Sequence, residues 1–420
     1  MKFKSARKDL VLKNNDRFYL KSKSPFAPKH YKDLYPQGFK IYTFNAGFKK
    51  KNDDLLIIVF DNIVNVASKY SLTAMPSAPI IWDKKNNKGK CRALIVNSGN
   101  ANAYTGLSGL KNIDKYTKKL AEYLSCSKKE ILVSSTGVIG EQLNPNLICR
   151  KISKLFFSNK KMLVDAARSI WTTDTFVKTA IYNIKILNKN IKIYGFAKGS
   201  GMISPNMGTM LAYIFIDCEI NRTELKKLLT NNIEETFNSI SVDSDTSTSD
   251  TLMLFSNPLN KIKLNNKNYN KISKTLNKVM KELSFKIISD GEGVKKLIKV
   301  NVKKAKSKSQ AKNIAFSVSN SPLVKTAIAG EDANWGRVVM AIGKTKEKIL
   351  QNKITIKFGN LLLAKKGERN SKVNLSKIDN YMKKNLIEIE INLNLGNESS
   401  VVYGNDLNKE YIKINADYRS

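Results

Sequence analysis

Histidine and cysteine are scarce in this chain, and their scarcity excludes several kinds of active site. The 420 residues include a single histidine, His30, so a serine–histidine or cysteine–histidine arrangement has almost no material to form from. The four cysteines (Cys91, Cys126, Cys149 and Cys218) are scattered without a CxxC spacing. We therefore expect reduced thiols rather than a disulfide framework, and we expect no metal site.

Long apolar runs are also missing. No stretch approaches the roughly 20 apolar residues that a membrane-spanning helix needs. The start of the chain, MKFKSARKDLVLKNNDRF, has no apolar segment of the kind found in secretion signals. Together with the reduced cysteines, these absences predict a cytoplasmic protein with no membrane partner.

Acidic residues are too few to balance the basic ones. The chain has 73 Lys and Arg against 35 Asp and Glu, which gives a net charge of +38. Such an excess can indicate nucleic-acid binding. Here the excess is mostly lysine, spread over the whole length among many asparagines, and no zinc finger or basic amphipathic helix is present. This pattern favours a lysine-rich solvated surface, which attracts small anions, over a specific nucleic-acid partner.

The apolar content and its patterning predict an α+β protein. With 42% hydrophobic residues, the chain can bury the cores of two or three domains. Residues 1–30 resemble a basic extension in which Pro25 and Pro28 break any helix. Asn221 and Glu224 have the spacing of a helix N-terminus. We expect strands at 54–60, 92–96, 131–134, 210–216, 252–255, 297–302 and 387–395, and helices at 111–124, from 221 for about fifteen residues, and at 276–288, 307–318 and 334–341.

The run KGSGMISPNMGTML at 198–211 contains the strongest candidate for a nucleophile. In it Gly208 precedes Thr209, and an apolar segment follows. A threonine hydroxyl needs a base, and without histidine the available base is the threonine's own amine, once the chain is cut before it. The missing side chain of Gly208 would let the hydroxyl approach the carbonyl. A Gly-Thr pair entering a strand is also an ordinary turn, so spacing alone leaves both interpretations open.

Other glycine-rich segments follow predicted strands, but none fits a phosphate-binding motif. Neither GxGxxG after a strand nor GxxxxGK[ST] is present, which argues against a Rossmann or P-loop nucleotide site. Taken together and in order, the segments resemble the ornithine acetyltransferase/glutamate N-acetyltransferase family of arginine biosynthesis, from about residue 37 to the C-terminus. The segments that carry the resemblance are NSGNANAYTG (97–106), SSTGVIG (134–140), TTDTFVK (172–178), KGSGMISPNMGTML (198–211), VDSDTSTSDT (242–251), DGEGVKK (290–296), GEDANWGR (330–337) and NADYRS (415–420).

The resemblance implies a precursor that cleaves itself between Gly208 and Thr209. The products are an α chain (31–208, after the extension 1–30) and a β chain (209–420), the latter with a C-terminal α/β portion from about 297. The implied fold is a layered α/β sandwich of the ornithine acetyltransferase/β-aminopeptidase type. The implied assembly is a heterotetramer of two α and two β chains.

The resemblance also implies a function and a set of site residues. Thr209 would carry acetyl from N-acetyl-ornithine to glutamate, with acetyl-CoA as a further candidate donor and no tightly bound cofactor. The implied oxyanion-hole pair is Thr136 and Gly137, whose hydroxyl and backbone N–H would stabilise the tetrahedral intermediate. The implied substrate-binding residues are Thr172 or Thr173, Lys198, Thr209, Glu331, Asn415 and Ser420.

Some positions depart from the family pattern, and two other functions compete with the one implied. Gly208 stands where the family usually has Ala, Tyr104 where it has Cys, Ser244 where it has Gly, and Ser420 where it has Thr. An N-terminal-nucleophile amidohydrolase or aminopeptidase would use the same nucleophile but transfer the acyl group to water. The second alternative, a nucleic-acid-binding protein, is favoured only by the net charge of +38.

Overall fold

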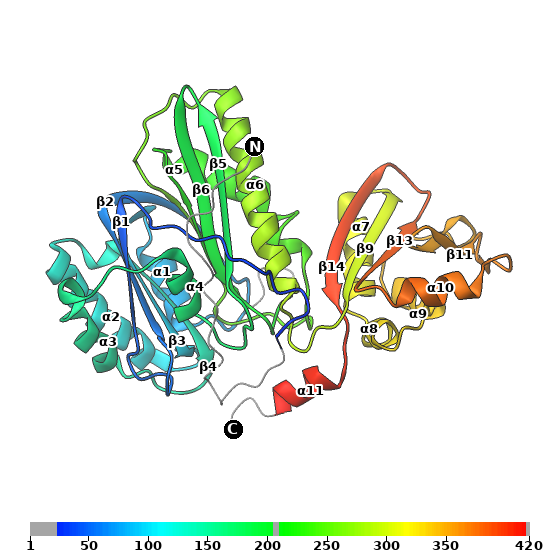
Figure 1. The fold of residues 1–420 in the computed structure, drawn as a ribbon, viewed down its shortest axis with the longest axis horizontal. Helices are drawn as coiled ribbons and strands as arrows, with labels where there is room; N and C mark the ends of the chain where they lie inside the picture. The colour runs from blue at the N-terminus through cyan, green and yellow to red at the C-terminus, as the bar shows by residue number, and fades with distance from the viewer. Residues whose placement is uncertain (1–22, 205–209, 417–420) are drawn as a thin grey trace.

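The computed structural model describes residues 23–204 and 210–416 and has two β-sheets, each covered by helices (Figure 1). Within these ranges the larger sheet has eight strands in the order β4-β3-β2-β8-β7-β6-β5, with β1 paired to β2 beside this path. Its strands are β1 (Phe39–Phe44), β2 (Leu55–Tyr70), β3 (Lys90–Asn100), β4 (Ile131–Val138), β5 (Lys178–Ile186), β6 (Lys189–Lys198), β7 (Leu211–Ile216) and β8 (Thr251–Ser256). The β3–β4 and β7–β8 pairs are parallel, and the others are antiparallel.

Alternation along β2 shows how the larger sheet is buried on both faces. Leu55 and Ile57 belong to an apolar cluster with the first three helices, whereas Leu56 and Ile58 belong to a cluster on the opposite face with α4. The helices around this sheet are α1 (Ala78–Asn86), α2 (Gly106–Leu124), α3 (Pro145–Ile152), α4 (Leu163–Ser169), α5 (Arg222–Ile233) and α6 (Asn266–Ile288). A strand buried on both faces has a continuous apolar sequence, and this is why the run at 54–60 was recognisable.

Aromatic rings fill the centre of the α4 side of the sheet. The ring of Phe215 lies 4.6 Å from that of Phe39 and 5.3 Å from that of Phe255, centroid to centroid. The far side of strands β5–β8 packs on α5 and α6, and the long α6 runs beside the β5–β6 hairpin (Figure 1). The larger sheet is therefore a layer between helices, as the α+β sandwich prediction requires.

The smaller sheet is built from residues after 296. Its strands, in the order β12-β11-β10-β13-β9-β14, are β9 (Leu297–Ala305), β10 (Thr355–Phe358), β11 (Leu361–Lys365), β12 (Glu368–Arg369), β13 (Leu386–Asn392) and β14 (Glu398–Asn405). β9 and β13 are parallel, and the other pairs are antiparallel. The C-terminal helices are α7 (Lys308–Ser319), α8 (Pro322–Ala329), α9 (Trp335–Gly343), α10 (Leu375–Met382) and α11 (Lys409–Ala416).

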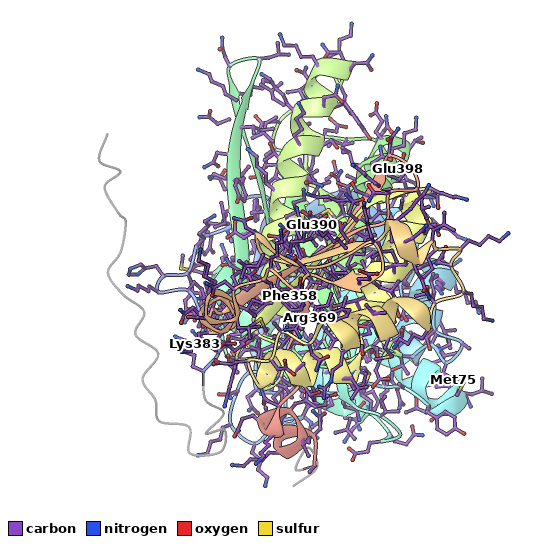
Figure 2. The ribbon with its side chains drawn as sticks, turned by 90° about the vertical axis from the view of Figure 1, so that its right-hand side faces the viewer. Met75, Phe358, Arg369, Lys383, Glu390 and Glu398 are labelled. Atoms are coloured by element: carbon purple, nitrogen blue, oxygen red, sulfur yellow. The ribbon has the colours of Figure 1, made fainter. Side chains whose placement is uncertain are left out.

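The smaller sheet has one apolar and one charged face. In β13, Ile387, Ile389 and Ile391 are buried in a core with α7–α10, while the alternate residues Glu388 and Glu390 are more exposed. Figure 2 brings this part of the molecule to the front, with Glu390 and Phe358 near its centre. The period of two confirms the strand predicted from the IEIEINLNL pattern.

Contacts join the two sheets through a short segment after α5. The N–H of Ser241 donates to the carbonyl of Tyr403 in β14 at 2.9 Å. The amine of Lys325 in α8 donates to the carbonyl of Val242 at 2.8 Å. Near the end of the chain, the hydroxyl of Tyr411 in α11 donates to Asp243 at 3.2 Å. Asp243 also accepts the N–H of Met202 at 2.6 Å and that of Ile203 at 2.9 Å, so the C-terminal helix lies near the segment that follows β6.

The predicted α+β class is confirmed, and a few element boundaries differ from the prediction. Asn221 caps α5 by accepting the N–H of Glu224 at 3.0 Å, as predicted. α6 begins at Asn266, ten residues before the predicted start at 276, because its polar first turns hide the apolar period. β13 ends at Asn392 rather than at 395.

Candidate active site

The ends of β6 and β7 bring together the residues on either side of the predicted cleavage site. Gly208, Thr209 and Ser420 lie outside the described residues. Lys198, the last residue of β6, is paired with Leu211, the first residue of β7. The strand before the predicted junction therefore ends, and the strand after it begins, at the same end of the larger sheet.

Lys198 and Thr172 are in direct contact. Lys198 is 2% exposed, and its amine donates to the hydroxyl of Thr172 at 3.1 Å. Burial lowers the pKa of the Lys198 amine, while the carboxylates of Asp174 and Asp250 act in the opposite direction. Thr173 is also buried, but of the two adjacent threonines it is Thr172 whose hydroxyl accepts this bond.

A buried ion-pair cluster supports this contact. The amine of Lys178, at the start of β5, lies 2.6 Å from Asp174 and 2.5 Å from Asp290, and all three side chains are 0% exposed. Burial would raise the pKa of Asp174, but the charges of Lys178 and Lys198 outweigh it and lower that pKa to about 2. Asp174 also accepts the N–H of Gly199 at 2.8 Å, so it fixes the chain just after β6.

The predicted oxyanion pair lies at the end of β4, where that strand runs parallel to β3. Gly137 is paired with Gly99 and has φ = +132°. A Cβ at position 137 would lie 2.3 Å from the carbonyl carbon of Gly99, so only glycine fits there. Thr136 is 2% exposed. The strand ending thus has the geometry of a close backbone approach.

The segment at 46–49 links the β3–β4 end to the Thr172 region. A Cβ at Gly99 would lie 2.9 Å from the carbonyl oxygen of Phe48, so these backbones touch. The amine of the next residue, Lys49, donates to the carbonyl of Trp171 at 2.6 Å. Asp54 holds the segment by accepting the N–H of Lys49 at 2.8 Å. The predicted oxyanion pair and the Lys198–Thr172 pair are therefore parts of one packed region.

Lys49 is a polar residue of this region that the sequence analysis did not identify. Burial lowers the pKa of its amine to about 8, with a smaller contribution from the positive charge of Lys198 and against the opposing effect of Asp54 and Asp174. A lysine in a lysine-rich loop carries no signal in the sequence that separates it from its solvated neighbours.

Asp250 is a second residue that was not identified, although it lies within the VDSDTSTSDT segment. It directly precedes β8, and its Oδ1 accepts the N–H of Met210 at 2.9 Å. It is 0% exposed, and burial raises its pKa well above the ordinary value for aspartate. Met210 follows Thr209 in the chain, so Asp250 lies beside the described end of the predicted junction.

Asn415 and Glu331 occupy different surroundings. The amide of Asn415 in α11 donates to Glu292 at 2.8 Å, and the N–H of Glu292 donates to the carbonyl of Ser200, two residues after Lys198. Glu331 follows α8 and is paired with Lys296 at 2.9 Å, with its side chain 46% exposed. The structure therefore brings Asn415 to the segment after β6 and places Glu331 at the start of β9. The residue that caps α9 is Asn334, whose Oδ1 accepts the N–H of Arg337 at 3.1 Å, so neither Glu331 nor Asp332 serves as that cap.

Comparison with known proteins decides the family. The model of the ArgJ family matches residues 40–420. This chain belongs to the ArgJ family. The resemblance inferred from the eight segments is confirmed, and the chain is an enzyme of arginine biosynthesis.

Curated relatives cover almost the whole ArgJ-family chain. The "Arginine biosynthesis bifunctional protein ArgJ" of Brucella suis biovar 1 is 41% identical over 410 residues, which is 95% of this chain and 99% of the relative. The protein of the same name from Bartonella henselae is 43% identical over 390 residues, 91% of this chain and 95% of the relative.

Two solved structures are also similar. The arginine biosynthesis bifunctional protein ArgJ of Bacillus halodurans is 33% identical with a TM-score of 0.47, covering 50% of this chain and all of that chain (100%). The ornithine acetyltransferase of Mycobacterium tuberculosis, solved in complex with ornithine, is 25% identical with a TM-score of 0.35, covering 41% of this chain and 97% of that chain.

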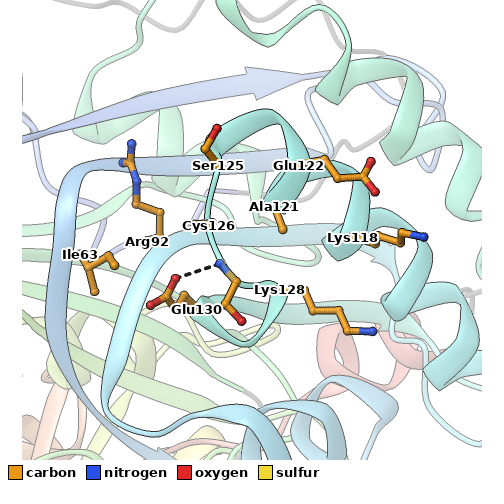
Figure 3. Close-up of a pocket in the computed structure, with 10 residues that line it drawn as sticks. Ile63, Arg92, Lys118, Ala121, Glu122, Ser125, Cys126, Lys128 and Glu130 are labelled. Carbon is orange, nitrogen blue, oxygen red and sulfur yellow. Dashed lines mark hydrogen bonds between the residues drawn. The ribbon is translucent and has the colours of Figure 1, made fainter.

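A surface hollow of this ArgJ-family protein lies apart from the predicted site. It has a volume of about 630 Å³ and is formed where α2 ends, beside β2 and β3 (Figure 3). Arg92, Lys118, Lys128, Glu122 and Glu130 contribute charged groups of both signs to its lining. None of the predicted site residues lines this hollow, so it is not part of the predicted active site.

The described residues contain neither a membrane-spanning helix nor a cluster of metal ligands. Within residues 23–204 and 210–416, no helix combines the length and apolar character needed to cross a membrane. In the same residues, no group of three or more His, Cys, Asp or Glu side chains could hold a metal ion. The four cysteines are free thiols.

Proposed function

We propose that this ArgJ-family enzyme transfers acetyl from N2-acetyl-L-ornithine to L-glutamate through an acetyl ester on Thr209. The observation that carries the proposal is family membership over 40–420, joined to the hydrogen bond between the buried Lys198 and the half-buried Thr172 at the strand end that leads toward position 209. The relatives are named as bifunctional proteins of arginine biosynthesis, and one similar structure is an ornithine acetyltransferase holding ornithine.

The nucleophile is proposed to form by cleavage of the chain itself. The hydroxyl oxygen of Thr209 attacks the carbonyl carbon of Gly208 and forms an ester, the C–N bond between the two residues breaks, and the hydroxyl proton passes to the nitrogen, which becomes an amine. Water then hydrolyses the ester and leaves Gly208 with a carboxylate. An α-amine has an ordinary pKa of about 8, so it can accept a proton near neutral pH and can activate the adjacent hydroxyl.

Acetyl transfer is proposed to follow in two half-reactions. The Thr209 oxygen attacks the acetyl carbonyl of N-acetyl-ornithine, its proton passes through the α-amine to the departing nitrogen, and ornithine leaves. The amine of glutamate then attacks the ester, and N-acetylglutamate leaves as the hydroxyl is restored. In both steps the carbonyl oxygen becomes an oxyanion, for which the backbone N–H of Gly137 and the hydroxyl of Thr136 are the proposed donors.

Substrate binding is assigned to polar groups around this region. The amine of Lys198 is suited to an α-carboxylate, and Asp174 and Asp250 favour its charged form. Thr172 is the proposed hydrogen-bonding threonine because it already contacts Lys198. Glu331, with its half-exposed carboxylate, is assigned to an ammonium group of the substrate. Asn415 is assigned to the same site through Glu292. Ser420 remains the predicted second C-terminal binding residue.

The remaining features of the proposal concern the second donor and the setting. Acetyl-CoA presents the same acetyl carbonyl to the same hydroxyl, so it is the proposed second donor. The ester chemistry needs no bound cofactor. We propose that the mature protein contains two α and two β chains. The free cysteines fit a reducing compartment, and we propose the cytoplasm.

Two measurements test the proposed function. Intact-mass analysis should show two fragments, one ending at Gly208 and one beginning at Thr209, and the Thr209→Ala variant should remain full-length. Labelled acetyl from N-acetyl-ornithine should appear in N-acetylglutamate, with acetyl-CoA tried in parallel as donor. An uncleaved chain of 47.2 kDa that transfers acetyl normally would overturn the mechanism. Release of acetate with no N-acetylglutamate would instead identify an amidohydrolase.

A further inference from the structure

Asp250 makes a contact at the described end of the proposed cleavage junction. Its Oδ1 accepts the N–H of Met210 at 2.9 Å. The nitrogen of Met210 is bonded directly to the carbonyl carbon of Thr209, so whatever fixes this nitrogen restricts the backbone of Thr209 as well. The contact is made by described residues and does not depend on where the junction itself lies.

The backbone around Asp250 holds its carboxyl group in place. The carbonyl of Asp250 accepts the N–H of Ser71 at 3.0 Å. The N–H of the next residue, Thr251, donates to the carbonyl of Met210 at 3.1 Å, and Thr251 is paired with Leu211 across the parallel β7–β8 ladder. Met210 is thus held twice, by the side chain of Asp250 and by the backbone N–H of Thr251.

The carboxyl group of Asp250 is fully buried among polar groups. Asp250 is 0% exposed, and the N–H of Met210, the N–H of Ser247 and the hydroxyl of Ser71 each act against the effect of burial on its pKa. The hydroxyl of Ser71 also lies 2.7 Å from the carbonyl oxygen of Ser247. In support, burial raises the pKa of Asp250 while the amine of Lys198 lowers it, so the group is in electrostatic contact with the proposed carboxylate-binding lysine.

We propose that Asp250 is a positioning residue for Thr209, because it holds the N–H of Met210, the residue bonded directly to the nucleophile. This inference rests on the proposed function, since it assigns a role toward the nucleophile named there. A reacting group displaced by about 1 Å can lose on the order of 100-fold in rate. Asp250 therefore affects both self-cleavage and acetyl transfer, because the same hydroxyl acts in both.

The experiment compares three variants with the full-length parent. Asp250→Ala removes both oxygens, and Asp250→Asn retains one oxygen as acceptor for the Met210 N–H. Asp217→Asn is the matched control: Asp217 is also a buried carboxyl, it accepts the hydroxyl of Tyr194 at 3.1 Å, and it directly follows the opposite end of β7. The rate of appearance of the Thr209 fragment, kcat and KM for acetyl transfer, and the thermal midpoint are measured for each.

We expect Asp250→Ala to slow cleavage and lower kcat by about 100-fold with KM nearly unchanged. Asp250→Asn should fall between Ala and the parent, and Asp217→Asn should cleave and turn over within about twofold of the parent even where its thermal midpoint falls. Parental rates in Asp250→Ala would overturn the inference, and so would equal losses in Asp250→Ala and Asp217→Asn. Equal losses in the folded Ala and Asn variants would also overturn it and would assign proton transfer instead. If the parent itself neither cleaves nor transfers acetyl, the proposed function fails first, and this inference falls with it.

Discussion

The two sheets of this protein treat charge in opposite ways. At the end of the larger sheet, Lys178, Asp174 and Asp290 are fully buried and paired with one another. On the smaller sheet, Lys303 and Glu390 pair at 2.6 Å on the solvated face, with the lysine 45% exposed. The ion pairs on both sheets have short N···O distances. Only those of the larger sheet are shielded from solvent, so water cannot replace a partner that is removed.

This difference indicates where substitutions should lower the free energy of unfolding most. The smaller sheet separates its groups by simple alternation, with isoleucines inward and glutamates outward along β13. The larger sheet instead buries polar groups at one end, where Lys198, Thr172 and Asp250 also lie. Buried charges are expensive unless paired, and they are concentrated in the part of the molecule to which we assign the chemistry.

The largest expected effect is on the buried cluster. Lys178→Met should destabilise the protein by about 3–5 kcal/mol, because it leaves the carboxylates of Asp174 and Asp290 buried without their cation. Denaturant unfolding of the parent and the variant measures the difference in the free energy of unfolding. A loss below about 1 kcal/mol, similar to that of an exposed pair, would remove the contrast between the two sheets.

A slightly smaller effect concerns the contact between the sheets. Burial lowers the pKa of Lys325 from 10.5 to about 8, while its amine donates to the carbonyl of Val242. Between these two pH values the unfolded chain binds more protons at this site than the folded protein does, so the contribution of Lys325 to stability rises with pH across that window. The rise should be on the order of 3 kcal/mol.

The measurement for Lys325 is the pH dependence of unfolding. The stability of the parent minus that of Lys325→Met should increase from pH 8 toward pH 10.5. A difference that is constant over this range would show that the amine keeps an ordinary pKa in the fold.

The next effect tests the close backbone approach at the end of β4. Gly137→Ala should lower acetyl transfer by about 100-fold and stability by roughly 1–3 kcal/mol, because a Cβ would overlap the carbonyl carbon of Gly99. Gly140→Ala is the matched control, since Gly140 also has a positive φ (+88°) but has no atom within 4 Å of the added Cβ. Kinetics and thermal unfolding of both variants separate the effect of the overlap from that of backbone strain. Equal behaviour of the two would contradict the assigned role of Gly137.

The smallest expected effect is on the smaller sheet. Glu390→Gln removes the ion pairs with Lys303 and Lys357 from a solvated face. The free energy of unfolding should change by less than about 1 kcal/mol, and the change should shrink further in added salt. Urea titrations at low and high ionic strength measure both. A loss as large as that of Lys178→Met would show that exposure does not distinguish the two sheets.

The sequence predicted much of the fold because many elements carry local signals. The apolar run at 54–60 and the alternating run near 390 were recognisable from their periods, and Asn221 from its spacing to Glu224. The start of α6 was predicted ten residues too late, because the residues after Asn265 are polar and show no apolar period. Asn265 nevertheless caps the helix by accepting the N–H of Asn268.

The site was predicted unevenly for a similar reason. Thr136, Gly137 and Lys198 stand in segments that resemble a family, so they were named without any knowledge of their contacts. Lys49 and Asp250 were not named, because a lysine among lysines and an aspartate in a polar run look solvated. Their burial shows only after strands distant in sequence are placed side by side.

The order of residues along the chain was enough to determine the family, the α+β class and the identity of the proposed nucleophile, because these follow from motifs and periods that neighbouring residues define. The tertiary structure decided which of Thr172 and Thr173 contacts Lys198, that Asn415 reaches Glu292, and that Asp250 holds Met210. These contacts join residues that are 26 to 123 positions apart in the chain. A local sequence pattern cannot predict them, because it does not indicate which distant side chains will be buried together away from water.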